Sequence, residues 1–247
     1  MKIHLNQYRY YFFDMGSTLI EFHNSAWDEA AVIQNGYQRL IHELTAQYDA
    51  AVAAIVDSAV IQPWYTYLEH ERKKQRVEYP IAEELFFCLA RQGITVSMQN
   101  ILALLRTEYH DFYTYAHCTE GALEVLKTLK SSGCSIAVVS NTMYPECLYK
   151  EIFERTGLAA YIDYYQFSYT NRFMKPHRSM FIKPLMALEA PISETIMVGD
   201  LEYSDITGAK QIGLAACLYD RSHAMQPTSA DYTIHRLEAL CSSYASH

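Results

Sequence analysis

The stretch that most constrains this chain is Tyr8–Ile20, which reads YRYYFFDMGSTLI. Five aromatic residues occupy its first six positions, and a single acid, Asp14, follows them at once. A short β-prone run that ends in a carboxylate and a Gly-Ser-Thr turn predicts a buried strand that carries Asp14 to an edge of a sheet. A charge at the end of a buried strand is costly unless something binds it, and ligands bind at this edge of α/β sheets. The stretch therefore predicts a site as well as a strand.

The composition limits the classes of function. At 247 residues the chain can bury a large core, and half of its residues are apolar, so we expect an ordered fold. The formal net charge of −8 argues against nucleic acid as a partner, because phosphate backbones attract basic surfaces. No apolar run reaches the length of a membrane span, and the N-terminus lacks the apolar stretch of a secretion signal. The six scattered cysteines form no CxxC pair and are interpreted as reduced thiols of a cytoplasmic protein.

Residues 21–115 differ from the segments that flank them, because they contain no convincing strand and their apolar residues recur at helical spacing. With about 90 residues, the interval has the size of a small helical domain. Within it, the charged run His70–Arg76 is interpreted as a solvated helix face or a loop, and a substrate-contacting basic patch is the alternative. The expected helices are Trp27–Leu44, Tyr48–Tyr67, Ile81–Gln92 and Ser97–Tyr115, the last with Ser97 as its N-cap.

From Glu120 onward, predicted strands and helices alternate. The strands are apolar throughout, which is typical of a parallel sheet that is covered on both faces. We therefore expect an α/β fold with a Rossmann-like parallel sheet and helices on both of its faces. The expected strands are Ser135–Val139, Tyr161–Ser168, Thr195–Val198, Leu214–Tyr219 and Asp231–Ile234, and the expected helices are Gly121–Lys130, Pro145–Thr156, one through Phe181 and Leu188, and Asp205–Ile212.

Polar side chains stand where these predicted strands end. Asp14, Ser140 and Asp200 each follow an apolar strand directly, and Lys175 follows another strand after a short loop. Because the ends of parallel strands share one edge, two carboxylates, a hydroxyl and an ammonium are expected in one place. Two carboxylates can hold Mg²⁺, the hydroxyl and the ammonium can hold phosphate oxygens, and one carboxylate can attack phosphorus. The set indicates phosphoryl chemistry.

Each of these residues also has a plainer interpretation when it is taken alone. Asp14 can be a helix N-cap or a buried ion-pair partner of Lys175, and Ser140 with Asn141 can be a simple turn. Lys175 can precede a helix that starts with proline, and Asp200 can cap the turn that follows it. Only their joint placement favours a site.

Four motifs in this order, FFDMGSTL, VVSNT, KPHRSMF and VGDLEYSD, make the chain resemble the haloacid dehalogenase-like hydrolase superfamily. The resemblance covers Tyr8–Ile20 and Glu120–Tyr219. It implies a Rossmann-like core domain of residues 1–20 and 116–247 and a helical cap domain of residues 21–115, inserted after the first motif. Specificity in a capped enzyme depends on the insertion, where the sequence shows no motif.

The resemblance implies a Mg²⁺ site and a nucleophile. Asp14 is then the nucleophile and a metal ligand, and Asp200 is the second carboxylate on the metal. Gly16 contributes its main-chain carbonyl to the same metal. Asp205, counted with the metal site, orients metal-bound water or Lys175.

The resemblance implies a phosphate-binding set as well. Ser140 donates a hydrogen bond to a phosphoryl oxygen, with help from the backbone of Asn141. Lys175 neutralises charge on the phosphoryl group and on Asp14. Thr18 braces the loop beside the substrate. Such electrostatic stabilisation is usually the largest contribution to catalysis.

One departure from the family pattern concerns Gly16. Most phosphatases of the family have a second Asp at this position, which acts as general acid and base, and glycine cannot carry a proton. General acid–base catalysis contributes about 10²- to 10⁴-fold in rate. The enzyme is therefore slow, or uses a substrate with a good leaving group, or takes a proton carrier from elsewhere. Glu21 and His23 are the nearest candidates in sequence, and exposed hinge residues are their alternative interpretation; Ser17 stands where the family usually has glycine.

We therefore expect a Mg²⁺-dependent phosphatase of small phosphorylated metabolites that acts through an aspartyl-phosphate. Two alternatives stay open. One is hydrolysis of a carbon–halogen bond in a small acid, as in the dehalogenating branch of the superfamily. The other is a phosphate- and metal-binding regulatory protein that is catalytically weakened by Gly16. The sequence specifies neither the substrate nor the oligomeric state.

Overall fold

The computed structural model describes residues 7–23, 28–223 and 227–241. Its centre is a six-stranded sheet in the order β5-β4-β1-β6-β7-β8, and every neighbouring pair is parallel. β1 lies between β4 and β6, with Tyr10 opposite both Ser135 and Thr195. The strands are β1 (Tyr10–Phe13), β4 (Ser135–Ser140), β5 (Tyr164–Phe167), β6 (Thr195–Gly199), β7 (Ala215–Tyr219) and β8 (Tyr232–Ile234).

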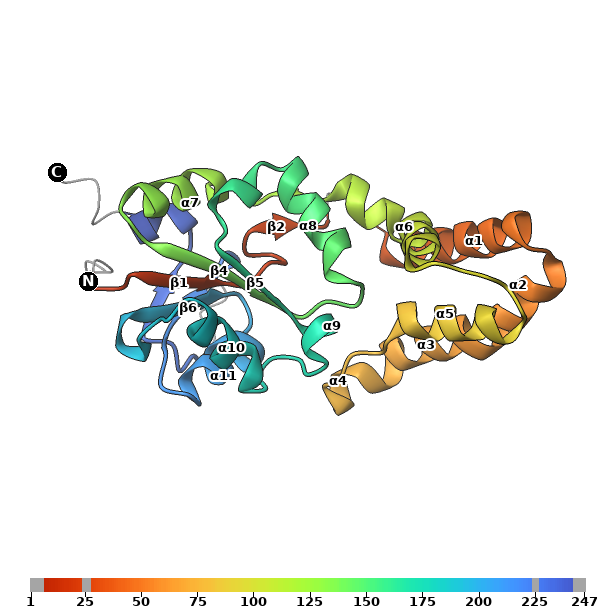
Figure 1. The fold of residues 1–247 in the computed structure, drawn as a ribbon. Helices are drawn as coiled ribbons and strands as arrows, with labels where there is room; N and C mark the ends of the chain where they lie inside the picture. The colour runs from red at the N-terminus through yellow and green to blue at the C-terminus, as the bar shows by residue number, and fades with distance from the viewer. Residues whose placement is uncertain (1–6, 24–27, 224–226, 242–247) are drawn as a thin grey trace.

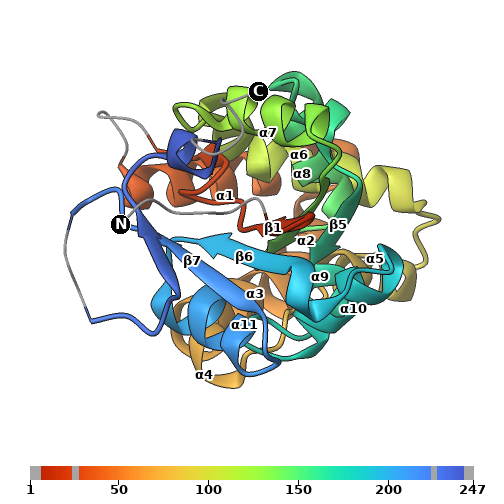
Figure 2. The ribbon, with the colours of Figure 1, turned by 90° about the vertical axis from the view of Figure 1, so that its left-hand side faces the viewer.

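Helices cover both faces of this sheet (Figures 1 and 2). Successive side chains of a strand point to opposite faces, so Tyr11 and Phe13 enter one apolar core while Phe12 enters another. The first core includes residues of α7 (Ala122–Ser131) and α8 (Glu146–Arg155), and the second includes residues of α10 (Ser179–Ala187) and α11 (Gly208–Lys210). The prediction of an α/β fold with a parallel sheet covered on both faces is confirmed.

Residues 29–115, which we call the helical segment, extend to one side of the sheet and its helices (Figure 1). α1 and α5 both pack against α6. Ser97 caps α6 in a reciprocal capping box with Asn100, as the sequence predicts for the cap itself. The helices are α1 (Glu29–Gln47), α2 (Ala50–Val56), α3 (Gln62–Thr66), α4 (Arg72–Gln75), α5 (Ile81–Arg91) and α6 (Met98–Tyr115).

Some predicted element bounds are wrong. The expected helix Tyr48–Tyr67 starts only after its N-cap Asp49 and contains a π-helical turn, Asp57–Ile61, between α2 and α3. The expected strand Tyr161–Ser168 begins at Tyr164, because the chain first completes a short 3₁₀ turn. The expected helix from Asp205 starts earlier as a π-helical turn at Glu202 and ends with α11. A short antiparallel pair, β2 (Ile20–Glu21) with β3 (His117–Cys118), stands unpredicted where the chain leaves and re-enters the sheet region.

The helical segment contacts the sheet region along a seam between residues 76–83 and residues 168–174. Val77 forms an isolated β-bridge with Phe173, which adds main-chain hydrogen bonds to this contact. Glu83 accepts a hydrogen bond from the hydroxyl of Tyr169 at 2.7 Å and pairs with Arg172 at 2.5 Å. The seam fixes one end of the helical segment against α9 (Ser168–Asn171). The division into a core domain (1–20 and 116–247) and a cap domain (21–115) stays a prediction.

A buried carboxylate makes a second contact between the two regions. Glu108 of α6 is 3% exposed and accepts hydrogen bonds from the hydroxyls of Tyr65 at 2.7 Å and Tyr144 at 2.6 Å. Tyr65 belongs to the helical segment, whereas Tyr144 follows β4. Burial raises the pKa of Glu108. Among the described residues, no cation lies within hydrogen-bonding distance of Glu108 to compensate for its desolvation.

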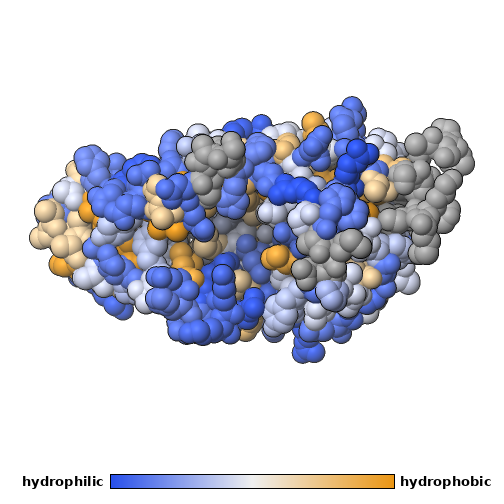
Figure 3. Space-filling view, turned by 180° about the vertical axis from the view of Figure 1, so that it is seen from behind, coloured by the Kyte–Doolittle hydropathy of each residue, from blue (hydrophilic) through white to orange (hydrophobic). Residues whose placement is uncertain are grey.

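The helices of the described residues differ from a membrane span in length or in apolarity. Within the described ranges, no helix combines the length and the apolarity that a crossing requires. The face seen in Figure 3 is mostly hydrophilic, and its apolar side chains gather in small groups.

Candidate active site

Lys175 lies between two carboxylates at the carboxyl edge of the sheet. Its Nζ is 2.5 Å from Oδ1 of Asp14 and 2.6 Å from Oδ1 of Asp205, and it donates a hydrogen bond to the carbonyl of Val139 at 2.6 Å. Burial lowers the pKa of Lys175, but the charges of Asp14 and Asp205 outweigh that effect and leave the pKa raised. Lys175 is therefore a charged counter-ion inside the protein. Asp14 is its ion-pair partner, as one of the plainer interpretations of Asp14 expects.

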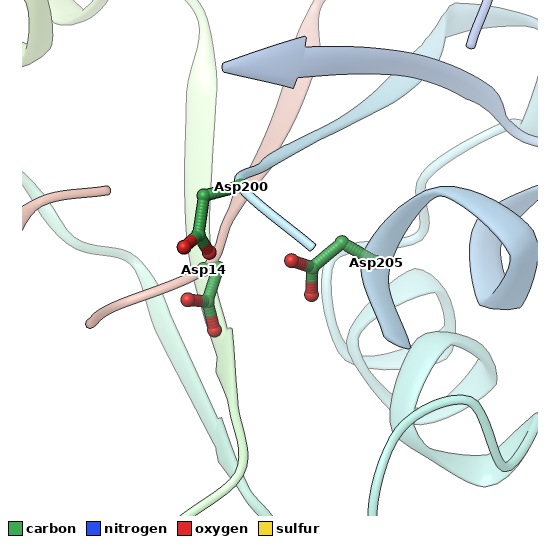
Figure 4. Close-up of side chains that lie close together, drawn as sticks. All are labelled: Asp14, Asp200 and Asp205. Atoms are coloured by element: carbon green, nitrogen blue, oxygen red, sulfur yellow. The ribbon is translucent and has the colours of Figure 1, made fainter. Parts of the chain in front are cut away.

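Asp200 is the carboxylate that the lysine leaves without a partner. It follows β6 directly, and its buried Oδ1 has no hydrogen-bond partner among the described residues. Burial, followed by the charges of Asp14 and Asp205, raises the pKa of Asp200 to about 8. Figure 4 shows the three carboxylates turned toward one another. Burial is the largest cause of this shift, and the two neighbouring negative charges are the part of it that a bound cation would relieve.

The three carboxylates could share a cation. Asp14, Asp200 and Asp205 each offer an oxygen, and these oxygens all lie within 4.8 Å of one another. Hard oxygen ligands of this kind suit Mg²⁺, which takes one or two carboxylates and keeps several waters. The residues present therefore fit the metal that the sequence predicts. Asp205 has a second task, because its Oδ2 accepts a hydrogen bond from the main chain of Leu201 at 3.0 Å.

Asn141 contacts Lys175 through its side chain. Its Oδ1 accepts a hydrogen bond from the main-chain N–H of Lys175 at 2.7 Å, and its Nδ2 donates to the carbonyl of Lys175 at 3.4 Å. The motif that contains Asn141 predicts only a role for its backbone, and nothing in the sequence indicates this side-chain contact with Lys175. Ser140 ends β4, is 3% exposed and lines a cavity that opens over the three carboxylates. Its role in phosphate binding stays a prediction.

The loop after Asp14 brings Gly16 and Ser17 to the site. Gly16 lines the cavity, and a Cβ built on it would meet only the ring of Phe22, at 3.9 Å, which is ordinary van der Waals contact. Ser17 has φ of 57°, in the left-handed region that favours glycine. Thr18 is fully buried, its Oγ1 has no hydrogen-bond partner among the described residues, and it does not line the cavity. The roles of Gly16 as a metal ligand and of Thr18 as a brace stay predictions.

A cavity of about 420 Å³ opens over these groups. Its floor contains Asp14, Ser140, Lys175 and Asp200, so the structure brings together the groups that the motifs place at strand ends. The helical segment supplies Arg72, Tyr109 and Phe112 to the same cavity. The sequence offered only one hint of this set, because Arg72 lies in the charged run that had a substrate-contacting patch as its alternative interpretation.

The two proton carriers considered from the sequence are placed differently. Glu21 forms an ion pair with Arg221 and accepts a hydrogen bond from Thr119 at 3.3 Å, and it does not line the cavity. His23 lines the cavity. Of the two, only His23 lines the cavity that Gly16 also lines.

A family profile described as haloacid dehalogenase-like hydrolase matches residues 8–213. The chain belongs to the haloacid dehalogenase-like hydrolase family. The resemblance that the four motifs indicate is therefore confirmed, and so is the prediction of a hydrolase.

This chain is similar to three curated proteins, of which two are phosphatases by name and one is a nucleotidase. It is 37% identical to the ribulose-1,5-bisphosphate 5-phosphatase of Halopiger xanaduensis over 127 residues, which are 49% of this chain and 52% of that protein. It is 26% identical to the glyceraldehyde 3-phosphate phosphatase of Pyrococcus furiosus over 204 residues, which cover 82% of this chain and 77% of that protein. It is 32% identical to a pyrimidine 5'-nucleotidase of Escherichia coli over 126 residues, 49% of this chain and 55% of that protein. The first and third matches span about half the length of those relatives.

Solved structures agree on the fold. A 2-haloacid dehalogenase from Pseudomonas syringae has a TM-score of 0.62 at 20% identity, with 96% of this chain and 98% of that chain covered. A phosphatase of the family from Thermococcus onnurineus has a TM-score of 0.60 at 17% identity, with the same coverage. Because dehalogenases and phosphatases share this fold, the similarity does not choose between the two chemistries.

Proposed function

We propose that this protein is a Mg²⁺-dependent phosphatase of small phosphorylated metabolites. The observation that carries the proposal is the half-buried Asp200 beside Asp14, whose buried Oδ1 has no hydrogen-bond partner among the described residues and whose pKa is raised to about 8. Hydrolysis of a carbon–halogen bond requires no metal, so a carboxylate cluster that favours a cation supports phosphoryl chemistry instead. The names of the three relatives support the same choice.

In the proposed reaction Asp14 attacks phosphorus. Lys175 holds Oδ1 of Asp14, which fixes the orientation of the carboxylate and leaves its other oxygen for the attack. The bond between phosphorus and the ester oxygen breaks, and the leaving group takes the electron pair. Water then hydrolyses the aspartyl-phosphate, which releases phosphate and restores the carboxylate of Asp14.

The remaining residues bind and orient the phosphoryl group. Ser140 and the main chain after it donate hydrogen bonds to its oxygens, and Lys175 neutralises part of its charge. Asp14 and Asp200 would hold Mg²⁺, with Asp205 nearby, and the metal would supply electrostatic stabilisation to the transferring group. The helical segment, as a cap over residues 1–20 and 116–247, closes the cavity against water.

The second candidate is a phosphate- and metal-binding regulatory protein, and Gly16 is the observation that favours it. The variant Gly16→Asp separates the two candidates, because the position has room for a side chain. A gain of about 10²-fold or more in turnover indicates a competent site that lacks only its acid and base. Absence of turnover in both forms favours the regulatory protein.

The proposal is tested by phosphate release from a panel of phosphate monoesters, with Mg²⁺ and with EDTA. We expect release that depends on Mg²⁺ and that disappears in Asp14→Asn, with Asp57→Asn of the helical segment as a matched control. Equal rates in the parent protein and in Asp14→Asn would overturn the proposal. Release of chloride from 2-chloropropionate without metal would favour the dehalogenase.

A further inference from the structure

We infer that Arg72 is the residue of the helical segment that recognises the substrate, and that it donates hydrogen bonds to an uncharged oxygen, a hydroxyl or a carbonyl, of the leaving alcohol. This inference rests on the proposed function and names its substrate class, which is phosphate monoesters whose alcohol carries a second oxygen without a charge. It is supported by the place of Arg72 at the cavity, by the buried carboxylate that holds it and by the charge of the occupied site.

Arg72 is the hydrogen-bond donor that the helical segment contributes to the cavity. The described residues of that segment that line the cavity are Arg72, Tyr109 and Phe112. Phe112 has no polar side-chain atom, and the hydroxyl of Tyr109 is buried. A ligand that reaches these residues therefore meets one side chain that can donate to it.

One nitrogen of the Arg72 guanidinium is left for a ligand. Nε and Nη2 donate to the two carboxylate oxygens of Glu78, each at 2.8 Å. Nη1 donates to no described residue and, unlike Nη1 of Arg172, it is not buried. It therefore reaches open space, and the cavity is an open space that Arg72 borders. Two N–H groups of Nη1 are then available to an oxygen of the substrate.

Glu78 holds Arg72 in a fixed place relative to the expected phosphate-binding residues. Its side chain is 1% exposed, and it accepts a further hydrogen bond from the hydroxyl of Ser168. Oγ of Ser168 in turn accepts from the main-chain N–H of Thr142 at 2.7 Å, and Thr142 lies two residues after Ser140. A bidentate pair with a buried carboxylate fixes the plane of a guanidinium. Arg72 can therefore measure the distance from the phosphoryl group to a second group of the substrate.

The charge of the site favours an uncharged oxygen as that second group. With Mg²⁺ bound, the metal and the ammonium of Lys175 balance the three carboxylates of the active site. Arg72 and Glu78 balance each other as well. The two negative charges of a phosphoryl group then make the occupied cavity negative, even when His23, which also lines it, is protonated. A second anion on the substrate is repelled, whereas a hydroxyl or a carbonyl accepts from Arg72 without adding charge.

The test measures phosphate release, as kcat and KM, from matched pairs of esters. Each ω-hydroxyalkyl phosphate of about three to five carbons is paired with the alkyl phosphate of equal size, in which a methyl group replaces the hydroxyl. At the length that reaches Arg72, we expect kcat/KM for the hydroxyalkyl ester to exceed that of its partner about tenfold or more. The difference should lie mainly in KM, because a contact remote from phosphorus acts before and during the reaction alike. The ω-carboxyalkyl phosphate of that length should be a poorer substrate than the hydroxyalkyl ester.

Two variants remove the donor without leaving Glu78 as an unpaired buried charge. Arg72→Lys has a single nitrogen, which the pair with Glu78 takes up. The double variant Arg72→Met with Glu78→Met replaces the ion pair by apolar side chains of similar size. Both should reduce the advantage of the hydroxyalkyl ester to about twofold or less, mainly by raising its KM. Arg39→Lys, which changes the ion pair of Arg39 with Asp111 outside the cavity, is the matched control and should keep the advantage.

Three results would overturn the inference: equal kcat/KM within every pair in the parent protein, an advantage that survives in both Arg72 variants, or a preference for the carboxyalkyl ester. Phosphate release that is absent from every ester, or that survives Asp14→Asn, would instead overturn the proposed function. Calorimetry on Asp14→Asn measures Kd for the same pairs without turnover, and equal values within every pair would count against Arg72 whatever the rates show.

Discussion

The side-chain amide of Asn141 spans the main chain of Lys175, accepting from its N–H at 2.7 Å and donating to its carbonyl at 3.4 Å. Lys175 comes from a loop, whereas Asn141 directly follows a central strand. The amide thus ties the lysine that reaches Asp14 to the rigid sheet. An enzyme that stabilises charge with a lysine depends on the position of that lysine as well as on its charge.

Replacing Asn141 is expected to show how much catalysis depends on the position of Lys175, because the variant keeps the charge of Lys175. Asn141→Leu removes both hydrogen bonds, so the free energy of unfolding should fall by about 1–3 kcal/mol. Phosphate release should fall by about 10- to 100-fold in kcat, because the main chain that carries Lys175 is no longer tied to the end of β4. Asn171→Leu, which removes a buried amide that bonds Phe173 and Ser179 instead, should lose stability with a smaller change in kcat. An unchanged kcat in Asn141→Leu would contradict the positioning role.

Mg²⁺ binding is expected to depend on pH through Asp200. Burial and the neighbouring carboxylates raise the pKa of Asp200 to about 8, and only its ionised form binds a cation. The apparent affinity should therefore rise as the pH increases toward about 8 and level off above it. Isothermal titration calorimetry at several pH values measures this, and Asp200→Asn should bind weakly with no such rise. A flat pH profile in the parent protein would contradict the prediction.

Ser17→Gly is expected to stabilise the fold. Ser17 has φ of 57°, where a side chain costs about 1–2 kcal/mol and glycine has no such penalty. Glycine also adds conformational entropy to the unfolded chain, which offsets part of this gain. The net increase in the free energy of unfolding is therefore about 0.5–1 kcal/mol. Urea unfolding measures it. Ser132→Gly, at φ of −85°, is the matched control and should destabilise.

Glu108 is expected to make the stability fall as the pH rises. Burial raises its pKa above the usual 4.5, so the folded protein holds a proton that the unfolded chain releases. Its contribution is therefore full below the unfolded pKa and is lost as the pH increases through the folded pKa. Glu108→Gln should remove this pH dependence in urea unfolding, and the exposed Glu120→Gln should not. Parallel stability profiles for the parent and Glu108→Gln would exclude the effect.

Much of the sheet and its edge could be predicted, because a change from apolar to polar residues in the sequence marks where each strand ends. Aromatic residues stop at Asp14, and apolar strands stop at Ser140 and at Gly199 before Asp200. Parallel pairing then brings these ends together whatever the loops do, which is why the carboxylates could be placed from sequence.

The contacts of the helical segment could not be predicted, because they depend on packing between distant segments. Arg72 looks like one more residue in a charged run, and only its contact with Glu78 shows that it is largely withdrawn from solvent. Glu108 interrupts the apolar face of α6, and its partners Tyr65 and Tyr144 lie in two different parts of the chain. Helical spacing predicts that α6 exists, but it does not indicate which hydroxyls will meet a buried acid.

The seam at Val77 and Phe173 attaches the helical segment without using the cavity. Main-chain hydrogen bonds and the pairs of Glu83 hold the two regions together there. None of residues 76–83 and 168–174 lines the cavity. A substitution of Val77 or Phe173 therefore changes how the helical segment is attached and leaves every group that lines the cavity in place.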